Sequence, residues 1–405
     1  MRNPALVRVS GPLELFAAGF ADELASVGYS AVAASFQLQL MAHASRWLDG
    51  EGLGASGLSV EAVERFVAAR RAAGYTNYLT DRAIAPLLGY LRGLGVAPVA
   101  AATLAQTPVE VLLARYGEYL ALERGLTAAT VEGYVHAVRP FLAGIGEGGG
   151  GALELDGLSA RQVTAFVVVR CPGQSRGAAK MTVTALRSLL GFLHLDGVIP
   201  RSLVGAVPSA ASWRLSGLPR ALEPEHVRRL LDSCDRRTAA GCRDFAILTA
   251  LVRLGLRAGE VAALQLDDVD WRAGELVVVG KGRRSERLPL PVDVGEAITI
   301  YLRDGRPGTA QDRALFQRVR APHHGLTTGG VTQIVVSAAK RSGLGQIHAH
   351  RLRHTAATEM LRAGAPLAEI GQVLRHRQAL STAIYAKVDR QALRQLARPW
   401  PGARS

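Results

Sequence analysis

The sequence is poor in aromatic residues and in cysteine. Phe, Trp and Tyr make up 5% of the 405 residues, whereas the hydrophobic residues as a group reach 48%. A core with so few rings must be built mainly from Leu, Ala and Val, a composition that favours helices. The three cysteines, Cys171, Cys234 and Cys242, are odd in number and lack metal-ligand spacing. They argue against a disulfide framework and predict free thiols in a reducing cytoplasm.

The sequence also lacks a long uncharged hydrophobic run. No stretch reaches the ~18 apolar residues of a transmembrane helix. The N-terminal residues MRNPALVRVSGPLELF contain neither a sustained apolar run nor a cleavage site for a secretory signal. Together these absences predict a soluble, cytoplasmic protein with no membrane partner.

Acidic residues are fewer than basic ones, and the imbalance lies in the second half of the chain. From residue 217 onward, 30 Lys and Arg stand against 18 Asp and Glu, a net charge of +12, so residues 1–216 carry +2 of the total +14. A basic surplus suits a polyanionic partner. It also fits an Arg-rich background that merely keeps the protein soluble, and charge alone leaves both alternatives open.

The first half of the chain contains an internal duplication of a helical pattern. Apolar residues recur at three- and four-residue spacing between Ser starts and Gly stops. LSVEAVERFVAAR at residues 58–70 matches LSARQVTAFVVVR at 158–170, and LLGYLRGLGVAP from Leu87 matches LLGFLHLDGVIP from Leu189. This order predicts two helical modules, 1–103 and 104–208. Both copies could bind one partner, or one could have become a packing module.

A different organisation follows a linker predicted at residues 209–220. The third domain, 221–405, starts with helices that include the apolar segment RDFAILTALVRLGLRAGEVAAL, interrupted at Gly255. The pattern then alternates with a period of two, which predicts short strands around Val269, 276–279 and 287–290. Helices resume afterwards. The expected fold is mainly α, with duplicated helical modules followed by an α-rich domain that has a small antiparallel β-sheet.

Two basic residues of this third domain are candidate anion ligands. Arg257 lies between apolar helices, where a cation must be paired or poised for an anion. Glu260 could orient it, and a purely structural Arg257–Glu260 pair is the plainer alternative. Lys281 lies in the turn GKGRRSER between two strands, where it could reach a ligand and donate a proton. A solvated turn lysine is the commoner case.

The last 60 residues hold the densest set of candidates. His350, Arg353 and His354 in HRLRHT lie on one side of a predicted helix. An arginine fork and the later His376 could bind one phosphate together. Tyr385 in LSTAIYAKVD has a hydroxyl that could attack, although alone it is best explained as a packed helix residue. No HExxH motif accompanies these residues, so zinc or magnesium chemistry is unsupported.

Arg257, Lys281, His350, Arg353, His376 and Tyr385 follow in this order within one basic domain. The domain resembles the tyrosine recombinases, the phage-integrase and Xer class of site-specific recombinases. Four motifs carry the resemblance between residues 221 and 388: LGLRAGEVAALQLDDVDW, GKGRRSERLPLP, HRLRHTAATEML and LRHRQALSTAIYAKVD. The second helical module resembles the SAM-like core-binding domain of that family.

The resemblance implies a role for each site residue. Arg257 and Arg353 would stabilise the scissile phosphate, His376 would hydrogen-bond it, and His350 would act as a base or position groups. Lys281 would protonate the leaving 5′-hydroxyl, and Tyr385 would form a 3′-phosphotyrosyl link without metal, ATP or another cofactor. Glu260, His354 and Arg375 would support this site. Arg375 stands where the family commonly has glycine.

The resemblance and the intact residue set together predict a site-specific DNA recombinase of integrase or transposase type, a class associated with DNA integration, transposition and mobile elements. Its partner would be a double-stranded recombination site, on which a homotetramer synapses two sites, with other recombinases as possible partners. The resemblance also implies that the C-terminal tail docks on a neighbouring protomer, with Trp400 as a suitable apolar anchor. One alternative is a type IB topoisomerase-like relaxing enzyme. Another is a DNA-binding accessory subunit of a multi-recombinase system.

Overall fold

The computed structural model describes residues 4–98, 107–148, 153–209, 221–280, 284–376 and 379–388. Lys281, most of the predicted linker and the tail with Trp400 lie outside these ranges. The chain divides into two units, one comprising Met1–Val99 with Leu215–Ser405 and one comprising Ala100–Arg214. The finer division into domains 1–103, 104–208 and 221–405 stays a prediction.

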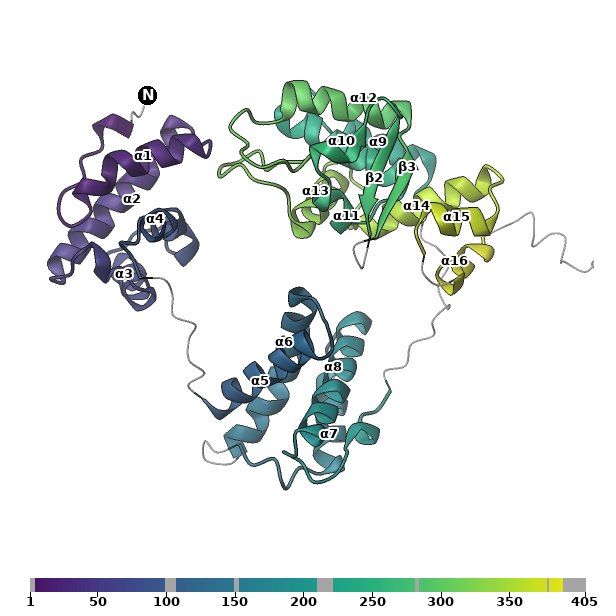
Figure 1. The fold of residues 1–405 in the computed structure, drawn as a ribbon, viewed down its shortest axis with the longest axis horizontal. Coiled ribbons are helices and arrows are strands. Elements are labelled where there is room, and N and C mark those ends of the chain that lie inside the picture. The colour runs from purple at the N-terminus through teal and green to yellow at the C-terminus, as the bar shows by residue number, and fades with distance from the viewer. Residues whose placement is uncertain are drawn as a thin grey trace, which may run out of the picture. The chain divides into compact units, whose positions relative to one another are not determined.

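The first helical group contains the α-helices labelled α1 to α4 (Figure 1). They are α1 (Ala17–Ser26), α2 (Ala31–Gly50), α3 (Val60–Ala72) and α4 (Asp81–Gly93). Two of them start at serines whose side chains accept a hydrogen bond from the first turn, Ser30 from Ala33 N and Ser59 from Ala62 N. Their apolar faces bury a separate core that includes Phe20, Met41, Phe66 and Leu91.

The second group repeats this order of helices. It consists of α5 (Pro108–Leu122), α6 (Ala128–Gly148), α7 (Ala160–Arg170) and α8 (Arg176–Leu195). In both groups the first helix packs on the second, the second on the fourth, and the third on the fourth. The matching helices α3 and α7 both start at a capping serine, Ser59 and Ser159. The internal sequence repeat thus corresponds to a repeated arrangement of helices.

The third part combines helices with one small sheet (Figure 1). Its strands, β1 (Val269–Asp270), β2 (Glu275–Val279) and β3 (Ser285–Pro289), are antiparallel in the order β1-β2-β3. The helices are α9 (Pro224–Asp232), α10 (Ala239–Leu254), α11 (Ala258–Ala263), α12 (Val292–Ile300), α13 (Thr328–Arg341), α14 (Ala349–Arg362), α15 (Leu367–Val373) and α16 (Ala379–Ala386). The predicted fold class, mainly α with a small antiparallel sheet, is confirmed.

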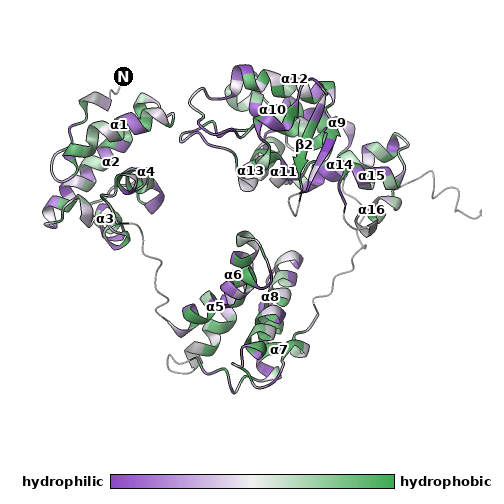
Figure 2. Ribbon diagram, viewed as in Figure 1, coloured by the Kyte–Doolittle hydropathy of each residue, from purple (hydrophilic) through white to green (hydrophobic). Residues whose placement is uncertain are grey.

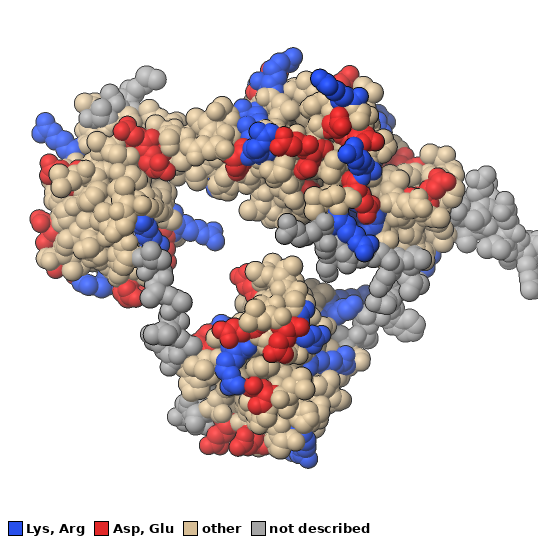
Figure 3. All heavy atoms as spheres, in the orientation of Figure 1, with Lys and Arg blue, Asp and Glu red and all other residues tan. Residues whose placement is uncertain are grey.

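Hydrophobic residues concentrate on the inner elements of this part, such as α10 and β2 (Figure 2). Alternate side chains of β2, Leu276 and Val278, are buried against the helices. Among the residues that the structure describes, no helix is long and apolar enough to cross a membrane. On the visible face of this part, acidic and basic side chains lie side by side (Figure 3).

A single glycine fixes the turn that leads to the candidate site. Gly255 follows α10 with φ +58°, a left-handed conformation that glycine adopts without strain. A Cβ at this position would lie 2.6 Å from the side chain of Leu374, which follows α15. Both the backbone angle and the lack of space therefore favour glycine. The α10–α11 turn thereby comes close to the residues that precede His376.

Candidate active site

Arg257 is held at one edge and open at the other. It precedes α11, and its Nη1 donates to Glu260 Oε1 at 2.5 Å while its backbone N–H donates to Glu260 Oε2 at 2.8 Å. Its Nη2 reaches the carbonyl of Arg375 at 3.4 Å. The side chain is nevertheless 43% exposed. Its guanidinium is therefore oriented by protein groups and still accessible to an anion.

Glu260 serves two arginines at once. Its side chain is 5% exposed, and its Oε2 also accepts from Arg375 Nη2 at 2.7 Å. Burial by itself raises the pKa of this carboxyl, but the backbone N–H of Arg257 and the charge of Arg375 outweigh it. The net effect lowers the pKa of Glu260, so the carboxylate is ionised at neutral pH.

Arg375 has an unusual backbone for an arginine. Its φ is +55°, in the left-handed region that non-glycine residues rarely adopt. Its guanidinium is 3% exposed and bonds Glu260 and the carbonyl of Val373. The chain thus keeps a charged residue at a backbone position suited to glycine, and its side chain lies inside the arginine–glutamate network rather than on the surface.

Arg353 ties together the segments on either side of the site. It lies on α14, is 2% exposed, and donates to the carbonyls of Gly255 (2.6 Å) and Leu374. Burial and the nearby Arg257 lower the pKa of Arg353 to about 10, which leaves it charged at neutral pH. In the described part of the cluster, three arginines (Arg257, Arg353, Arg375) face one carboxylate (Glu260), a net charge of +2.

Tyr385 lies among histidines next to this arginine cluster. Tyr385 on α16 is 1% exposed, and its hydroxyl forms a hydrogen bond with His354 Nδ1 at 2.9 Å. Its ring is parallel to that of His376, with centroids 6.5 Å apart. His350 lies one helical turn before His354, and its ring packs edge-on against the His354 ring with centroids 4.4 Å apart. His376 Nδ1 hydrogen-bonds Thr382 Oγ1 at 2.7 Å.

These surroundings keep the histidines neutral and the tyrosine protonated. Burial and neighbouring cations lower the pKa of His354 and of His376 to about 4, and burial also lowers the pKa of His350. Burial raises the pKa of Tyr385 to about 12, against the opposing charge of Arg353. The free protein therefore holds a protonated nucleophile candidate beside neutral imidazoles at neutral pH.

A cavity of about 1150 Å³ opens beside the cluster. Arg257, Arg375 and His376 line one part of it, together with Thr382 of α16. The β2–β3 hairpin contributes Gly280, Arg284 and Glu286. The hairpin that carries Lys281 thus borders the same cavity, although Lys281 itself lies outside the described residues.

The structure brings all the described candidates together and adds one. Hydrogen bonds link Arg257, Glu260 and Arg375, hydrogen bonds and ring contacts link His350, His354, Tyr385 and His376, and the charge of the buried Arg353 acts on both groups. Thr382, the partner of His376, was missed by the sequence analysis. Its position three residues before Tyr385, on one helix face, was the available signal. The structure also places His354, rather than His350, on the tyrosine hydroxyl.

Known proteins are similar to this chain in sequence and in fold. Residues 220–392 match the Phage integrase family. The putative integrase/recombinase y4rA of Sinorhizobium fredii is 42% identical over 396 residues, covering 97% of this chain and 95% of that protein. The chain belongs to the phage integrase family of tyrosine recombinases. The tyrosine recombinase XerD of Listeria monocytogenes is 29% identical to this recombinase. The alignment covers 70% of this chain and 96% of XerD.

Solved structures agree in fold. The XerH site-specific recombinase in a post-cleavage complex with its difH substrate aligns with a TM-score of 0.57 at 17% identity, covering 84% of this chain and 94% of that one. A lambda integrase dimer bound to a core site aligns with a TM-score of 0.54 at 18% identity, covering 73% and 98%. The predicted family and the predicted enzyme class, DNA breaking and rejoining, are confirmed. The relatives favour a recombinase over a relaxing enzyme or an accessory subunit.

Proposed function

We propose that the cluster binds one DNA phosphodiester and that Tyr385 attacks its phosphorus. The observation that carries the proposal is the net charge of +2 from three arginines and one glutamate. A phosphodiester carries one negative charge, and the five-coordinate arrangement formed on attack carries two. Fixed charges that match the developing charge are the main source of rate enhancement in such reactions.

Each residue then has a distinct part. Arg257, with its open edge, contacts the non-bridging oxygens directly. The buried Arg353 adds positive charge. Its guanidinium donates to the carbonyls of Gly255 and Leu374 and so holds the α10–α11 turn against the end of α15. His376 donates to the phosphate from the ring nitrogen that Thr382 leaves available, because Thr382 Oγ1 engages Nδ1. His350, exposed at the start of α14, completes the phosphate contacts.

The chemical outcome is a 3′-phosphotyrosyl intermediate. The Tyr385 oxygen bonds to phosphorus, the bond from phosphorus to the 5′-oxygen breaks, and Lys281 of the adjoining hairpin protonates that oxygen. The phosphodiester energy is retained in the tyrosyl ester, so rejoining requires only attack by a 5′-hydroxyl. No metal or ATP enters either step.

The substrate of the proposed reaction is a double-stranded recombination site. The basic third part would grip the backbone near the scissile phosphate, and the second helical module, 104–208, would bind the opposite side. The first module, 1–103, would add contacts to DNA or to another protein. Residues 221–405 would form the catalytic domain, and a homotetramer would hold two synapsed sites. The lambda integrase tetramer bound to a Holliday junction, which aligns with a TM-score of 0.52, supports such an assembly.

A nicked duplex that loses its 5′-hydroxyl fragment after cleavage tests the proposal. The wild-type recombinase is expected to form a covalent protein–DNA adduct that survives denaturation. Tyr385→Phe should form none, because the nucleophilic oxygen is absent. Tyr301→Phe is the matched control, since Tyr301 is a second buried tyrosine of the same domain and its hydroxyl accepts from Gln317 N, away from the cluster. An equal adduct with Tyr385→Phe would refute the proposal.

A further inference from the structure

One contact in the cluster is not explained by the roles above. The hydroxyl of Tyr385 lies 2.9 Å from Nδ1 of His354, a distance typical of a nucleophile and its base. The family resemblance instead assigns the base or positioning role to His350. Because His350 and His354 are one turn apart on α14, sequence spacing places both near the tyrosine and does not choose between them.

The direction of this hydrogen bond follows from burial. Tyr385 is 1% exposed, and a buried hydroxyl proton needs an acceptor. Among the described residues, the contact that the structure gives this hydroxyl is with His354 Nδ1. The Tyr385 hydroxyl therefore donates, Nδ1 accepts, and the ring proton of His354 lies on Nε2.

The orientation of the His354 ring is fixed by its neighbours. Its position on α14 is one turn after His350, whose ring packs edge-on against it at 4.4 Å. On the other side lies the ring of Tyr385, with centroids 5.6 Å apart. A nucleophile, an acceptor and a third group that orients the acceptor thus occur in sequence, as in other enzymes with activated nucleophiles.

We propose that His354 is a further catalytic residue, whose Nδ1 accepts the hydroxyl proton of Tyr385 as that oxygen attacks phosphorus. The inference rests on the proposed function and deepens it. When the bond from the Tyr385 oxygen to phosphorus forms, the hydroxyl proton moves to Nδ1. The bond from phosphorus to the 5′-oxygen breaks with its electron pair, and Lys281 protonates that oxygen. Rejoining reverses each transfer, and Nδ1 returns the proton to the tyrosine.

The electrostatics of the cluster suit an acceptor that works only with DNA bound. Burial, His350 and Arg353 lower the pKa of His354 to about 4, so Nδ1 is unprotonated and able to accept at neutral pH. A bound phosphodiester brings a negative charge into the same cluster. That charge opposes the cations and raises the affinity of the His354 ring for a proton. Without DNA, the tyrosine keeps its proton.

The first test compares single-turnover cleavage of the nicked duplex by wild type, His354→Gln and His354→Ala. Glutamine can accept the hydrogen bond but cannot take the proton, so we expect adduct formation to slow about 100-fold or more. Free imidazole should restore His354→Ala at least about tenfold, as an external proton acceptor. His226→Ala, which changes a half-buried histidine of α9 outside the cluster, should cleave at the wild-type rate with or without imidazole.

The second test separates proton acceptance from leaving-group protonation. A substrate with sulfur in place of the bridging 5′-oxygen expels a thiolate, which needs no proton. The defect of His354→Gln should persist on this substrate, whereas that of Lys281→Ala should shrink. A His354→Gln variant that cleaves at the wild-type rate would overturn the inference. So would a defect that disappears with the sulfur substrate. If wild type itself forms no adduct, the proposed function fails instead.

Discussion

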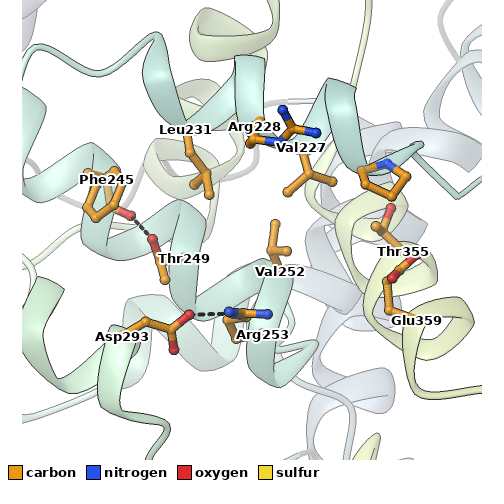
Figure 4. A pocket seen from close by; sticks show the side chains of 11 residues that line it. Val227, Arg228, Leu231, Phe245, Thr249, Val252, Arg253, Asp293, Thr355 and Glu359 are labelled. Atoms are coloured by element: carbon orange, nitrogen blue, oxygen red, sulfur yellow. Dashed lines mark hydrogen bonds and ion pairs between the residues drawn. The ribbon is translucent and has the colours of Figure 1, made fainter. Parts of the chain in front are cut away.

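Two cavities of the third part contain arginines, and only one of them has unbalanced charge. The smaller cavity, of about 300 Å³, lies between α9, α10, α12 and α14 (Figure 4). Its apolar lining consists of Pro224, Val227, Leu231, Phe245 and Val252. Its two arginines are each matched by a carboxylate, Arg253 by Asp293 and Arg228 by Glu225. These pairs are largely exposed and contribute little to stability.

The larger cavity has a different balance. Beside it, Arg257 and Arg375 share the buried carboxylate of Glu260, whereas Arg353 donates to backbone carbonyls, and both Arg353 and Arg375 are withdrawn from solvent. Arg284 and Glu286, which also line this cavity, carry opposite charges. A surplus of buried positive charge is costly unless an anion joins it. The difference between the cavities shows that the number of arginines does not identify a phosphate site. The positive charge that remains after ion pairing identifies it.

The largest expected effect comes from Arg353→Lys. A lysine ammonium does not reproduce the fork that reaches the carbonyls of both Gly255 and Leu374. We expect a loss of ~3 kcal/mol in the free energy of unfolding, measured by denaturant titration, and a fall of about 1,000-fold in adduct formation. Arg253→Lys in the smaller cavity is the matched control and should change both quantities little. Similar losses in the two variants would contradict the comparison.

Glu260→Gln should have the next largest effect. It removes the negative charge that Arg257 and Arg375 share, which leaves Arg375 buried without a counter-ion. We expect unfolding free energy to drop by ~2–3 kcal/mol and cleavage to slow about 10- to 100-fold, because Arg257 loses its orienting partner. Asp293→Asn, the equivalent change in the smaller cavity, should cost less than about 1 kcal/mol. Equal losses of unfolding free energy in Glu260→Gln and Asp293→Asn would contradict the distinction between the buried and the exposed ion pairs.

Arg375→Gly should change both the free energy of unfolding and the cleavage rate less than Glu260→Gln does. Glycine relieves the φ of +55°, a gain of ~1 kcal/mol, but the variant loses the ion pair with Glu260. Glu260 keeps its bonds to Arg257, so we expect stability to change by no more than ~2 kcal/mol and cleavage by less than about tenfold. A fall of 100-fold or more in kcat would instead make Arg375 a direct phosphate contact.

The smallest expected effect is a pH-dependent difference between wild type and His376→Gln. In the folded state, burial and then Arg353 lower the pKa of His376 to about 4, below the ~6.5 of an unfolded chain. Between these values the unfolded state binds the proton first, so stability falls as pH drops from about 6.5 to 4. Because solvent reaches part of the ring and screens its charge, the change should be at most ~1 kcal/mol. Thermal unfolding across this window measures it, and parallel curves for the two proteins would contradict it.

The sequence was enough to predict the family and the fold class, and its candidate site residues, where the structure describes them, lie close together. Four motifs in a fixed order identify the domain, and the spacing of His350 and Arg353 places both on one helix face. Helical spacing does not determine which histidine meets Tyr385, because that depends on how α16 packs on α14. The sequence showed that Arg375 replaces a common glycine, but the burial of its side chain on Glu260 depends on the tertiary fold.

The most direct test of the account is the identity of the residue that carries the DNA. Adduct formed by wild-type recombinase on the nicked duplex is digested with protease and nuclease, and the remaining nucleotide-bearing peptide is sequenced by mass spectrometry. We predict a 3′-phosphate joined to the oxygen of Tyr385. Attachment to another residue, or through a 5′-phosphate, would contradict a site in which three arginines and one glutamate present a phosphate to this tyrosine.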